Sequence, residues 1–414
     1  MIKVKTYENG LRVIVNRITG FRSVAVGVMV GAGSSKESEA ENGISHFIEH
    51  VNFKGTASRS AYDISDLTEG SGAQLNAYTA KDVTCYYVKC IDEKLEENFD
   101  VLADLFLNSV YPAEELDKER GVIIEEIKMV EDTPDDLCID SLANAYFGDR
   151  GFGATILGSE SNVSRFKKAD VLNYKSKHYT PDNTVISFAG NVSFEDAVKL
   201  VDKYFESFIA EKKRTVLSDS PAIELKWGKN AVQKAVEQAH ISVGFKSITA
   251  ASEDKIPVLL VNSVLGGGMS SRLFQTLREK AGLAYTVYSY VSVYKEAGVL
   301  YLYAAVNRKN VESAYNALLN EMRLISEKGI TAKELERAKE LIKGSTILSG
   351  ESTSSRMMSQ CKRLLLFNDV FDVNKELEKV SAVTLDKANE IAAKYFSPEL
   401  RATAVVGKNV SPLD

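Results

Sequence analysis

The sequence is poor in several residue types that mark particular classes of protein. Its 414 residues include four cysteines, four histidines, seven prolines and one tryptophan. It has no run of about 18 apolar residues, so we do not expect a membrane span or a membrane partner. The cysteines lack Cys-x-x-Cys spacing and are too sparse for a disulfide scaffold, so we expect reduced, mostly buried thiols at Cys85, Cys90, Cys138 and Cys361.

An excess of basic residues is also missing. Lys and Arg number 51 against 57 Asp and Glu, which gives a net charge of −6. A general nucleic-acid binder needs a basic surface, so nucleic acid is not an expected partner. The first residues alternate like a strand and lack the apolar stretch of a secretory signal, so the expected location is cytoplasmic. The remaining composition, 44% hydrophobic and 26% charged, is that of a globular chain long enough for two domains.

The most informative pattern is an internal repeat. Residues 97–120 and 312–339 share a helical apolar period and an Ala-x-Glu-Leu helix start. A second pair of similar segments, residues 67–78 and 277–285, precedes a β-rich run in each half. The polar residues 211–224 between the halves have the composition of a linker. We therefore predict two similar domains related by internal duplication, at residues 1–210 and 225–414.

Each half is expected to have an α+β fold. Asn9-Gly10 lies between two alternating runs and predicts a β-hairpin, and residues 23–30, 73–78 and 83–90 predict further strands. Strands with helices segregated between them favour an antiparallel sheet covered by helices on one face. In the first half we expect helices at about 43–54, 60–70, 93–109, 113–131, 136–146 and 193–208.

Two of the four histidines fall within a single helical turn, in the order His46-Phe47-Ile48-Glu49-His50. Residues three and four apart share a helix face, so His46, Glu49 and His50 project together. Two neutral imidazoles one turn apart can chelate one zinc ion and leave the carboxylate between them beside an activated water. Glu49 is therefore the expected general base.

A catalytic zinc usually needs a third protein ligand. The helix expected at 113–131 offers Glu119 and Glu126, which are two turns apart and share a face. Glu125 points about 100° away from them, the step of one residue in an α-helix. Helix geometry leaves both Glu119 and Glu126 possible.

These motifs resemble the pitrilysin/insulinase family of zinc peptidases, which includes the mitochondrial processing peptidases and their bacterial relatives. The family carries His-x-x-Glu-His, then a Glu at a characteristic distance that itself follows another Glu by two turns. Here Glu126 follows His50 by 76 residues and Glu119 by seven. The resemblance implies one Zn²⁺ per chain with His46, His50 and Glu126 as ligands, and Glu119 as an acid that steadies the site.

Further family features extend the resemblance over essentially the full chain. Residues 53–56, Phe-Lys-Gly-Thr, and residues 72–79 match the family pattern. In relatives the second of these segments is an exposed edge strand to which the substrate backbone adds. One departure is Asn52, because relatives usually carry two apolar residues directly after the motif. The resemblance implies substrate-binding roles for Ala73, Asn76 and Ala77.

The second half has no His-x-x-Glu-His turn, so we expect it to be metal-free. In the family, an Arg and a Tyr seven residues apart in this half reach the active site, and here they are Arg278 and Tyr285. The resemblance implies that they bind the peptide backbone and stabilise the oxyanion. It also implies that two chains face each other around a chamber, which predicts a homodimer, with a heterodimer of related subunits as the alternative.

The resemblance thus implies a zinc metalloendopeptidase that hydrolyses unfolded or short peptides inside a dimeric chamber. One alternative is a non-cleaving scaffold subunit of the same family, and another is a zinc-stabilised module that grips peptides. Structural zinc prefers four protein ligands, whereas three are expected here with a base beside them, which favours the enzyme. Imidazole and carboxylate ligands also suit manganese or cobalt, so the sequence leaves the metal open.

Overall fold

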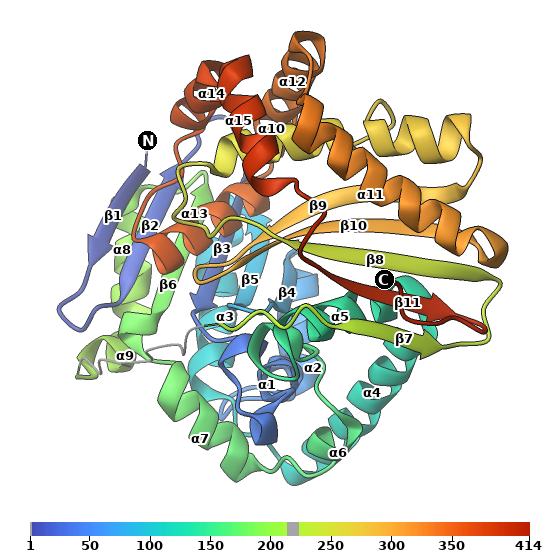
Figure 1. Ribbon diagram of the computed structural model, residues 1–414. Helices are drawn as coiled ribbons and strands as arrows, with labels where there is room; N and C mark the ends of the chain where they lie inside the picture. The colour runs from blue at the N-terminus through green and yellow to red at the C-terminus, as the bar shows by residue number, and fades with distance from the viewer. Residues whose placement is uncertain (1, 213–222) are drawn as a thin grey trace. The chain divides into compact units, whose positions relative to one another are not determined.

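The computed structural model describes residues 2–212 and 223–414 (Figure 1). Their contacts group them into two units, each of which includes a segment from the other half of the sequence. The predicted linker at 211–224 lies mostly outside the described residues, and the linear division at 1–210 and 225–414 stays a prediction. The first unit contains residues 2–127, 155–212 and 348–371, and the second contains 128–154, 223–347 and 372–414.

The first unit is built on a six-stranded sheet with the order β1-β2-β6-β3-β5-β4. All neighbours run antiparallel except β2 and β6, which are parallel. The expected hairpin at Asn9-Gly10 is present, because β1 pairs with β2 and places Thr6 opposite Arg12. The strands are β1 Ile2–Thr6, β2 Arg12–Arg17, β3 Ser23–Val30, β4 Gln74–Thr79, β5 Thr84–Ile91 and β6 Thr184–Gly190.

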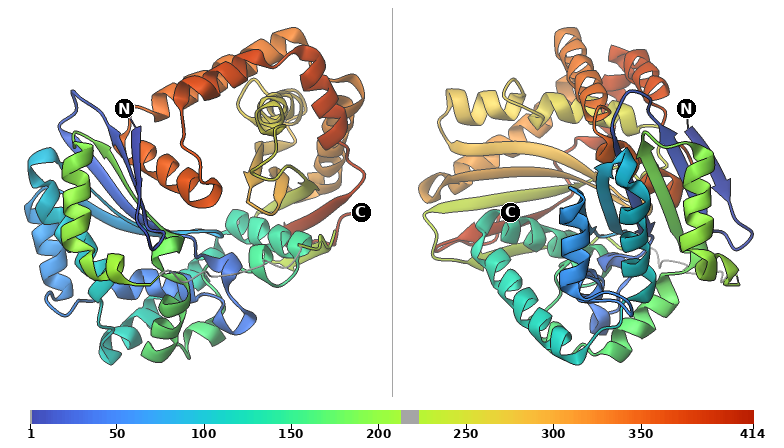
Figure 2. Two further views of the ribbon diagram at one scale, coloured as in Figure 1. Left: turned by 90° about the vertical axis from the view of Figure 1, so that its left-hand side faces the viewer. Right: turned by 180° about the vertical axis from the view of Figure 1, so that it is seen from behind.

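Helices cover both faces of this sheet. On one face, α3 packs against β3 and β5, and α8 packs against β2; on the other, α13 packs against β3 and β6. Figure 2 shows α13, in orange-red, and the blue-green helices on opposite sides of the sheet. The helices of this unit are α1 Ile44–Asn52, α2 Ala61–Gly70, α3 Leu95–Asn108, α4 Ala113–Asp132, α6 Glu160–Val163, α7 Lys168–His178, α8 Phe194–Tyr204, α9 Glu206–Ala210 and α13 Thr353–Phe367; the last residues of α4, from Lys128, group with the second unit.

The expectation of helices on one face was therefore incomplete. Successive residues of β2 point to opposite sides of the sheet, so Val13 and Val15 join the main core while Ile14 packs with Cys361 and Leu364 of α13. Strand β3 is buried along almost its whole length. A nearly continuous apolar strand is the pattern of a sheet that is covered on both faces.

The second unit repeats this design on a five-stranded sheet with the order β7-β11-β8-β10-β9. Strands β7 and β11 are parallel, and the other neighbours are antiparallel. Helix α5 packs against β8 and β11. The elements are α5 Pro134–Phe147, β7 Lys229–Gln233, β8 Gln238–Lys246, α10 Lys255–Gly266, a π-helix at Phe274–Lys280, β9 Ala284–Val293, β10 Gly298–Asn307, α11 Val311–Lys328, α12 Ala332–Ser349, α14 Val373–Ala382, α15 Leu385–Tyr395 and β11 Arg401–Gly407.

The two sheets confirm the predicted α+β fold and internal duplication. Reading each sheet from its parallel pair, β2-β6-β3-β5-β4 and β7-β11-β8-β10-β9 have the same chain order and the same strand directions. Each sheet also receives one helix from the other half of the sequence, α13 in the first unit and α5 in the second. The first sheet differs by one additional edge strand, β1.

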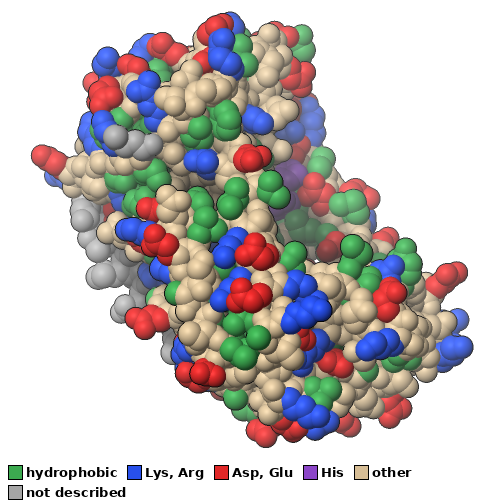
Figure 3. Space-filling model, turned by 90° about the horizontal axis from the view of Figure 1, so that it is seen from above, with side chains coloured by type: hydrophobic (Ala, Val, Ile, Leu, Met, Phe, Trp, Pro, Cys, Tyr) green, Lys and Arg blue, Asp and Glu red, His purple; other side chains and the backbone are tan. Residues whose placement is uncertain are grey.

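Charged side chains of both signs occur on the surface (Figure 3). On the face in Figure 3, basic and acidic side chains are interspersed rather than gathered into patches of one sign. Exposed ion pairs include Lys203–Glu96 and Lys394–Asp254, each 2.8 Å long. No helix among residues 2–212 and 223–414 has the length and apolar character to cross a membrane.

Candidate metal centre

The candidate centre is built on α1, a short helix with two different faces. Its core face buries Phe47, Ile48 and Val51, whereas His46 and His50 are half-buried on the other side. Alternation of apolar and polar positions at helical spacing produces this division.

A carboxylate from outside the helix caps its start. Glu37 Oε2 accepts a hydrogen bond from the Gly43 backbone N–H, and Glu37 Oε1 accepts one from the Ser45 N–H, both at 2.8 Å. These N–H groups lack partners inside a helix, and a negative charge near them interacts favourably with the helix dipole. Glu37 therefore fixes the start of the helix that carries the two histidines.

Glu126 of α4 faces both histidines of α1. Its Oε2 atom lies 3.8 Å from His46 Nε2 and 3.5 Å from His50 Nε2. One ligand atom from each of the three residues lies within 4.8 Å of the others, the one such group of three or more potential ligands in the part of the chain that is described. Ligand atoms of a tetrahedral zinc ion lie roughly 3.4 Å apart, so this donor set fits zinc.

The two imidazoles are prepared in different ways. Burial, together with the neighbouring His50, lowers the pKa of His46 to about 3, so this ring is neutral and keeps a lone pair for a metal. His46 Nδ1 is buried without a hydrogen-bond partner among the described residues. In His50, by contrast, the Nδ1 atom lies 3.0 Å from Glu119 Oε2. The Nε2 atom on the other side of the ring therefore points toward Glu126. Such a carboxylate behind a histidine orients a metal ligand.

Glu119 is held in turn by Lys54, whose Nζ lies 2.7 Å from Glu119 Oε1. Burial alone would raise the pKa of Glu119, but its bonds to His50 and Lys54 outweigh that effect and lower it. Glu119 is therefore ionised, and each of its two carboxylate oxygens already has a partner, His50 or Lys54. Of the two carboxylates that helix geometry left open, Glu126 faces both Nε2 atoms and Glu119 contacts the back of His50.

Glu49 lies on the same helix and is tied to the edge strand β4. Its Oε2 atom accepts a hydrogen bond of 2.6 Å from the Thr79 hydroxyl. Burial raises the pKa of Glu49, although the Thr79 bond and the nearby His50 oppose the shift. A carboxylate with a raised pKa beside a group of potential metal ligands is suited to accept a proton near neutral pH.

Strand β4 forms the edge of the first sheet, and β5 is its single neighbour in the described sheet. Asn76 and Ala77 lie within β4, Asn76 with an exposed side chain, and the buried Ala73 directly precedes the strand. The outer N–H and C=O groups of such an edge can pair with an added strand.

Arg278 and Tyr285 belong to the second unit, where the structure brings them together. The Arg278 guanidinium lies 5.2 Å from the centre of the Tyr285 ring and 4.8 Å from the centre of the Phe274 ring. Tyr285 is 70% exposed, so its hydroxyl is available to a ligand. The roles of Arg278 and Tyr285 in a peptidase site stay predictions.

Sequence reasoning assigned no role to three residues that shape the centre. Lys54 and Thr79 stand inside the two family motifs at 53–56 and 72–79, so the motifs contained a signal for them. Glu37 lies in no motif, and nothing in the sequence separates it from the many other acidic residues. Its role depends on a contact with α1 that only the folded chain reveals.

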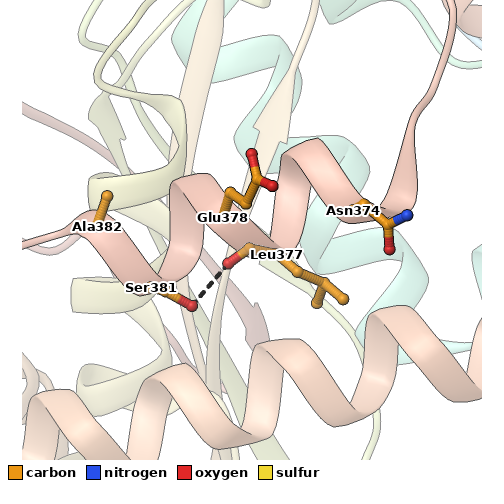
Figure 4. Close-up of a pocket in the computed structure, with 5 residues that line it drawn as sticks. All are labelled: Asn374, Leu377, Glu378, Ser381 and Ala382. Atoms are coloured by element: carbon orange, nitrogen blue, oxygen red, sulfur yellow. Dashed lines mark hydrogen bonds between the residues drawn. The ribbon is translucent and has the colours of Figure 1, made fainter.

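The second unit also has a shallow pocket on α14, drawn in Figure 4. One helix supplies all of its lining, and Ser381 uses its hydroxyl to bond the Leu377 carbonyl at 2.8 Å. It offers one carboxylate and no imidazole or thiol, which is too few ligands to hold a metal ion. Its lining residues are Asn374, Leu377, Glu378, Ser381 and Ala382.

Comparison with known families identifies the chain. Residues 12–160 match the family described as insulinase (peptidase family M16), and residues 165–342 match the peptidase M16 inactive domain. The chain therefore belongs to the insulinase family of peptidases. The second description agrees with the lack of a His-x-x-Glu-His turn in the second half of the sequence.

Individual relatives cover almost the whole chain. A Bacillus subtilis protein named uncharacterized zinc protease YmxG is 41% identical over 96% of this chain and 97% of its own length. An uncharacterized zinc protease of Streptomyces coelicolor is 35% identical over 94% of this chain and 86% of its own. The structure of a protease from Helicobacter pylori has a TM-score of 0.90 at 23% identity, covering 98% of this chain and 99% of that one, and so shares the fold.

Proposed function

We propose that the protein is a zinc-dependent endopeptidase that cleaves unfolded or short peptides. The observation that carries this proposal is the meeting of His46, His50 and Glu126 around one point, with Glu49 on the same helix face. Zinc bound there would supply a Lewis acid that lowers the pKa of a water molecule and polarises a carbonyl oxygen. Three protein ligands leave a position open, as catalytic sites require.

The chain's own residues would divide the remaining work. Glu49 would take the proton from the attacking water and later pass it to the leaving amine. Thr79 would hold the Glu49 carboxylate in place, and because Thr79 is part of β4, the strand that orients the base could also pair with the substrate backbone. Glu119 and Lys54 would fix the orientation of His50.

The assembly that supports this reaction is also part of the proposal. Arg278 and Tyr285 would bind the peptide backbone and stabilise the oxyanion. In a homodimer, the second unit of one chain would supply this pair to the first unit of its partner, around a shared chamber.

Replacement of Glu49 by Gln tests the function directly. Because the amide cannot accept the proton, we expect kcat for a fluorogenic peptide to fall by about 10²- to 10⁴-fold. Zinc affinity should change little, since Glu49 is not among the three ligand residues. For the wild-type chain, a chelator should abolish cleavage and added Zn²⁺ should restore it. A wild-type chain that binds zinc and peptides yet never cleaves would instead be a non-cleaving subunit.

A further inference from the structure

A group of polar side chains behind the end of α1, two of them buried and one half-buried, has no part in the function proposed above. Asn52 is the last residue of α1, Tyr111 lies between α3 and α4, and Lys175 belongs to α7. The Tyr111 hydroxyl donates to Asn52 Oδ1 at 2.8 Å, and Lys175 Nζ donates to the Tyr111 oxygen at 2.7 Å. We refer to these three residues as the Lys175 cluster.

The Lys175 cluster is costly to bury. Asn52 and Tyr111 are 0% and 2% exposed. The hydrogen-bond acceptors around the Lys175 ammonium are the Tyr111 hydroxyl, the Phe106 carbonyl at 3.0 Å and, in a longer contact of 3.5 Å, the Asn52 amide oxygen. Burial lowers the pKa of Lys175 to about 7. Apolar side chains of similar volume are often at least as stabilising as buried charged groups. The rings of Phe106, Tyr111 and Tyr179 lie 5.3–5.9 Å from the ammonium and offset part of this cost.

The backbone of Tyr111 adds a second observation. Its φ angle is 54°, in the left-handed region that bulky residues rarely occupy. Such a conformation is energetically unfavourable and persists where the surroundings impose it. Tyr111 stands two residues before α4 begins, so the hydroxyl that binds Asn52 also fixes the entry to that helix.

The Lys175 cluster thus joins the two helices that form the metal centre. Asn52 follows His50 by two residues on α1, and α4 carries Glu126. The Ser109 hydroxyl makes a second link to the end of α1, donating to the Asn52 backbone carbonyl at 2.9 Å. The 3.5 Å distance between His50 Nε2 and Glu126 Oε2 depends on how α1 and α4 are spaced.

We propose that Lys175 is a positioning residue of the metal centre, which acts through the Tyr111 hydroxyl to hold the end of α1 against the start of α4. This inference rests on the proposed function, because it concerns the same zinc site. The Lys175 cluster touches neither the metal nor the substrate. Its effect is on the spacing of the ligands, and so on metal affinity.

The test measures the dissociation constant for Zn²⁺ by competition with a chromophoric chelator. The proteins are the full-length wild type, Lys175→Met, Tyr111→Phe and the double variant. We expect each single variant to bind Zn²⁺ about tenfold more weakly, as partners beyond the ligands typically contribute. The double variant should be no weaker than Tyr111→Phe, because Lys175 acts through the hydroxyl that this substitution has already removed. Tyr111→Phe deletes one oxygen and no packing surface, so it keeps the test decisive if Lys175→Met does not fold.

Lys177→Met is the matched control. This lysine lies on the same helix, 57% exposed and 3.5 Å from Glu41, and its loss should leave Zn²⁺ affinity unchanged. Single variants that unfold more easily yet bind Zn²⁺ as tightly as the wild type would overturn the inference, and so would effects that add in the double variant. If the wild type cleaves peptides, such results leave the proposed function intact. A wild type that binds no Zn²⁺ would overturn both.

Discussion

At the scale of single residues, His50 combines two opposed contacts in one ring. Its Nε2 atom faces Glu126, while its Nδ1 atom lies 3.0 Å from Glu119, which Lys54 holds in turn. Burial would lower the pKa of His50, but the Glu119 bond and the nearby Glu126 and Glu49 raise it. When the ring is neutral, the Glu119 contact favours the tautomer with the proton on Nδ1 and the lone pair on Nε2. A ring fixed in this way is ready for a metal before the metal arrives.

Lys175 gives a prediction about stability and pH. Its pKa is about 7 in the folded protein against about 10.4 in an unfolded chain, so between these values only the unfolded state holds the proton. The contribution of this group to the free energy of unfolding therefore rises with pH between these two values, by at most roughly 1.4 kcal/mol per pH unit. We expect the wild type to gain about 2–3 kcal/mol over Lys175→Met between pH 7 and pH 9 in urea unfolding. A difference that does not change with pH would contradict the prediction.

At the scale of elements, α1 depends on residues outside itself. Glu37 caps its start, and the Ser45 hydroxyl lies 2.9 Å from the Tyr174 hydroxyl of α7. Its first turn also needs a glycine: Gly43 has φ 98°, and a Cβ atom there would lie 2.6 Å from the Leu157 carbonyl oxygen. Helix α1 is held in place from the cap onward.

Gly43→Ala should therefore destabilise the protein by at least about 2 kcal/mol, the sum of a left-handed backbone cost and the clash with Leu157. Gly20→Ala separates these effects, because Gly20 has nearly the same angle, φ 99°, and no atom within 4 Å of its Cβ position. Urea unfolding of both variants provides the measurement. Equal losses would show that the contact with Leu157 relaxes without cost.

The start of α12 carries a second prediction at this scale. The Glu334 carboxylate accepts hydrogen bonds from Arg272 Nε–H and from the Thr331 backbone N–H, both at 2.8 Å. These contacts lower the pKa of Glu334 to about 2, and the bond from Arg272 has the largest effect. A lowered carboxyl pKa contributes stability that is complete above about pH 4.5 and is lost as pH falls toward 2. Glu334→Gln should cost on the order of 1–3 kcal/mol at pH 7 and little at pH 2.5.

The exposed pair Arg323–Glu327 on α11 is the matched control for Glu334. Both side chains are about half exposed, so Glu327→Gln should cost less than about 0.5 kcal/mol at either pH. Thermal unfolding at the two pH values distinguishes the pairs. Similar losses in both variants would contradict the assigned role of Arg272.

At the scale of the whole molecule, the duplication separates two kinds of chemistry. The first unit carries the proposed metal ligands and the proposed base, and the second carries Arg278 and Tyr285 on a scaffold of the same topology. In the second unit, α10 is largely apolar and buried, and no metal-binding group lies among its described residues. The first unit has the polar cluster, and the second has a guanidinium close to two aromatic rings.

Complementation tests the proposed homodimer. Glu49→Gln and Arg278→Ala chains should each be nearly inactive, but a mixture should recover up to about one quarter of wild-type activity. In mixed dimers, one site combines an intact base with an intact Arg278, and random pairing makes half of the dimers mixed. A fluorogenic peptide assay after co-refolding provides the readout. A mixture no more active than either parent would rule out sites shared between chains.

Local sequence patterns were sufficient for the elements of the centre. Helix α1 was expected at 43–54 and spans Ile44–Asn52, and α3 was expected at 93–109 and spans Leu95–Asn108. Helical hydrogen bonds join residues four apart, so periodicity and capping residues predict them. The same periodicity placed His46, Glu49 and His50 on one face. Helix α7 and strand β6 were not predicted.

Only the tertiary structure determined which residues contact one another between those elements. Periodicity placed Glu119 and Glu126 on one face of α4, but only packing against α1 turns Glu126 to the Nε2 atoms and Glu119 to Nδ1. The Thr79 bond to Glu49 and the packing of α13 on the first sheet likewise join residues that are far apart in the sequence. Sequence spacing fixes directions within an element, whereas distances between elements follow from how side chains fill the core.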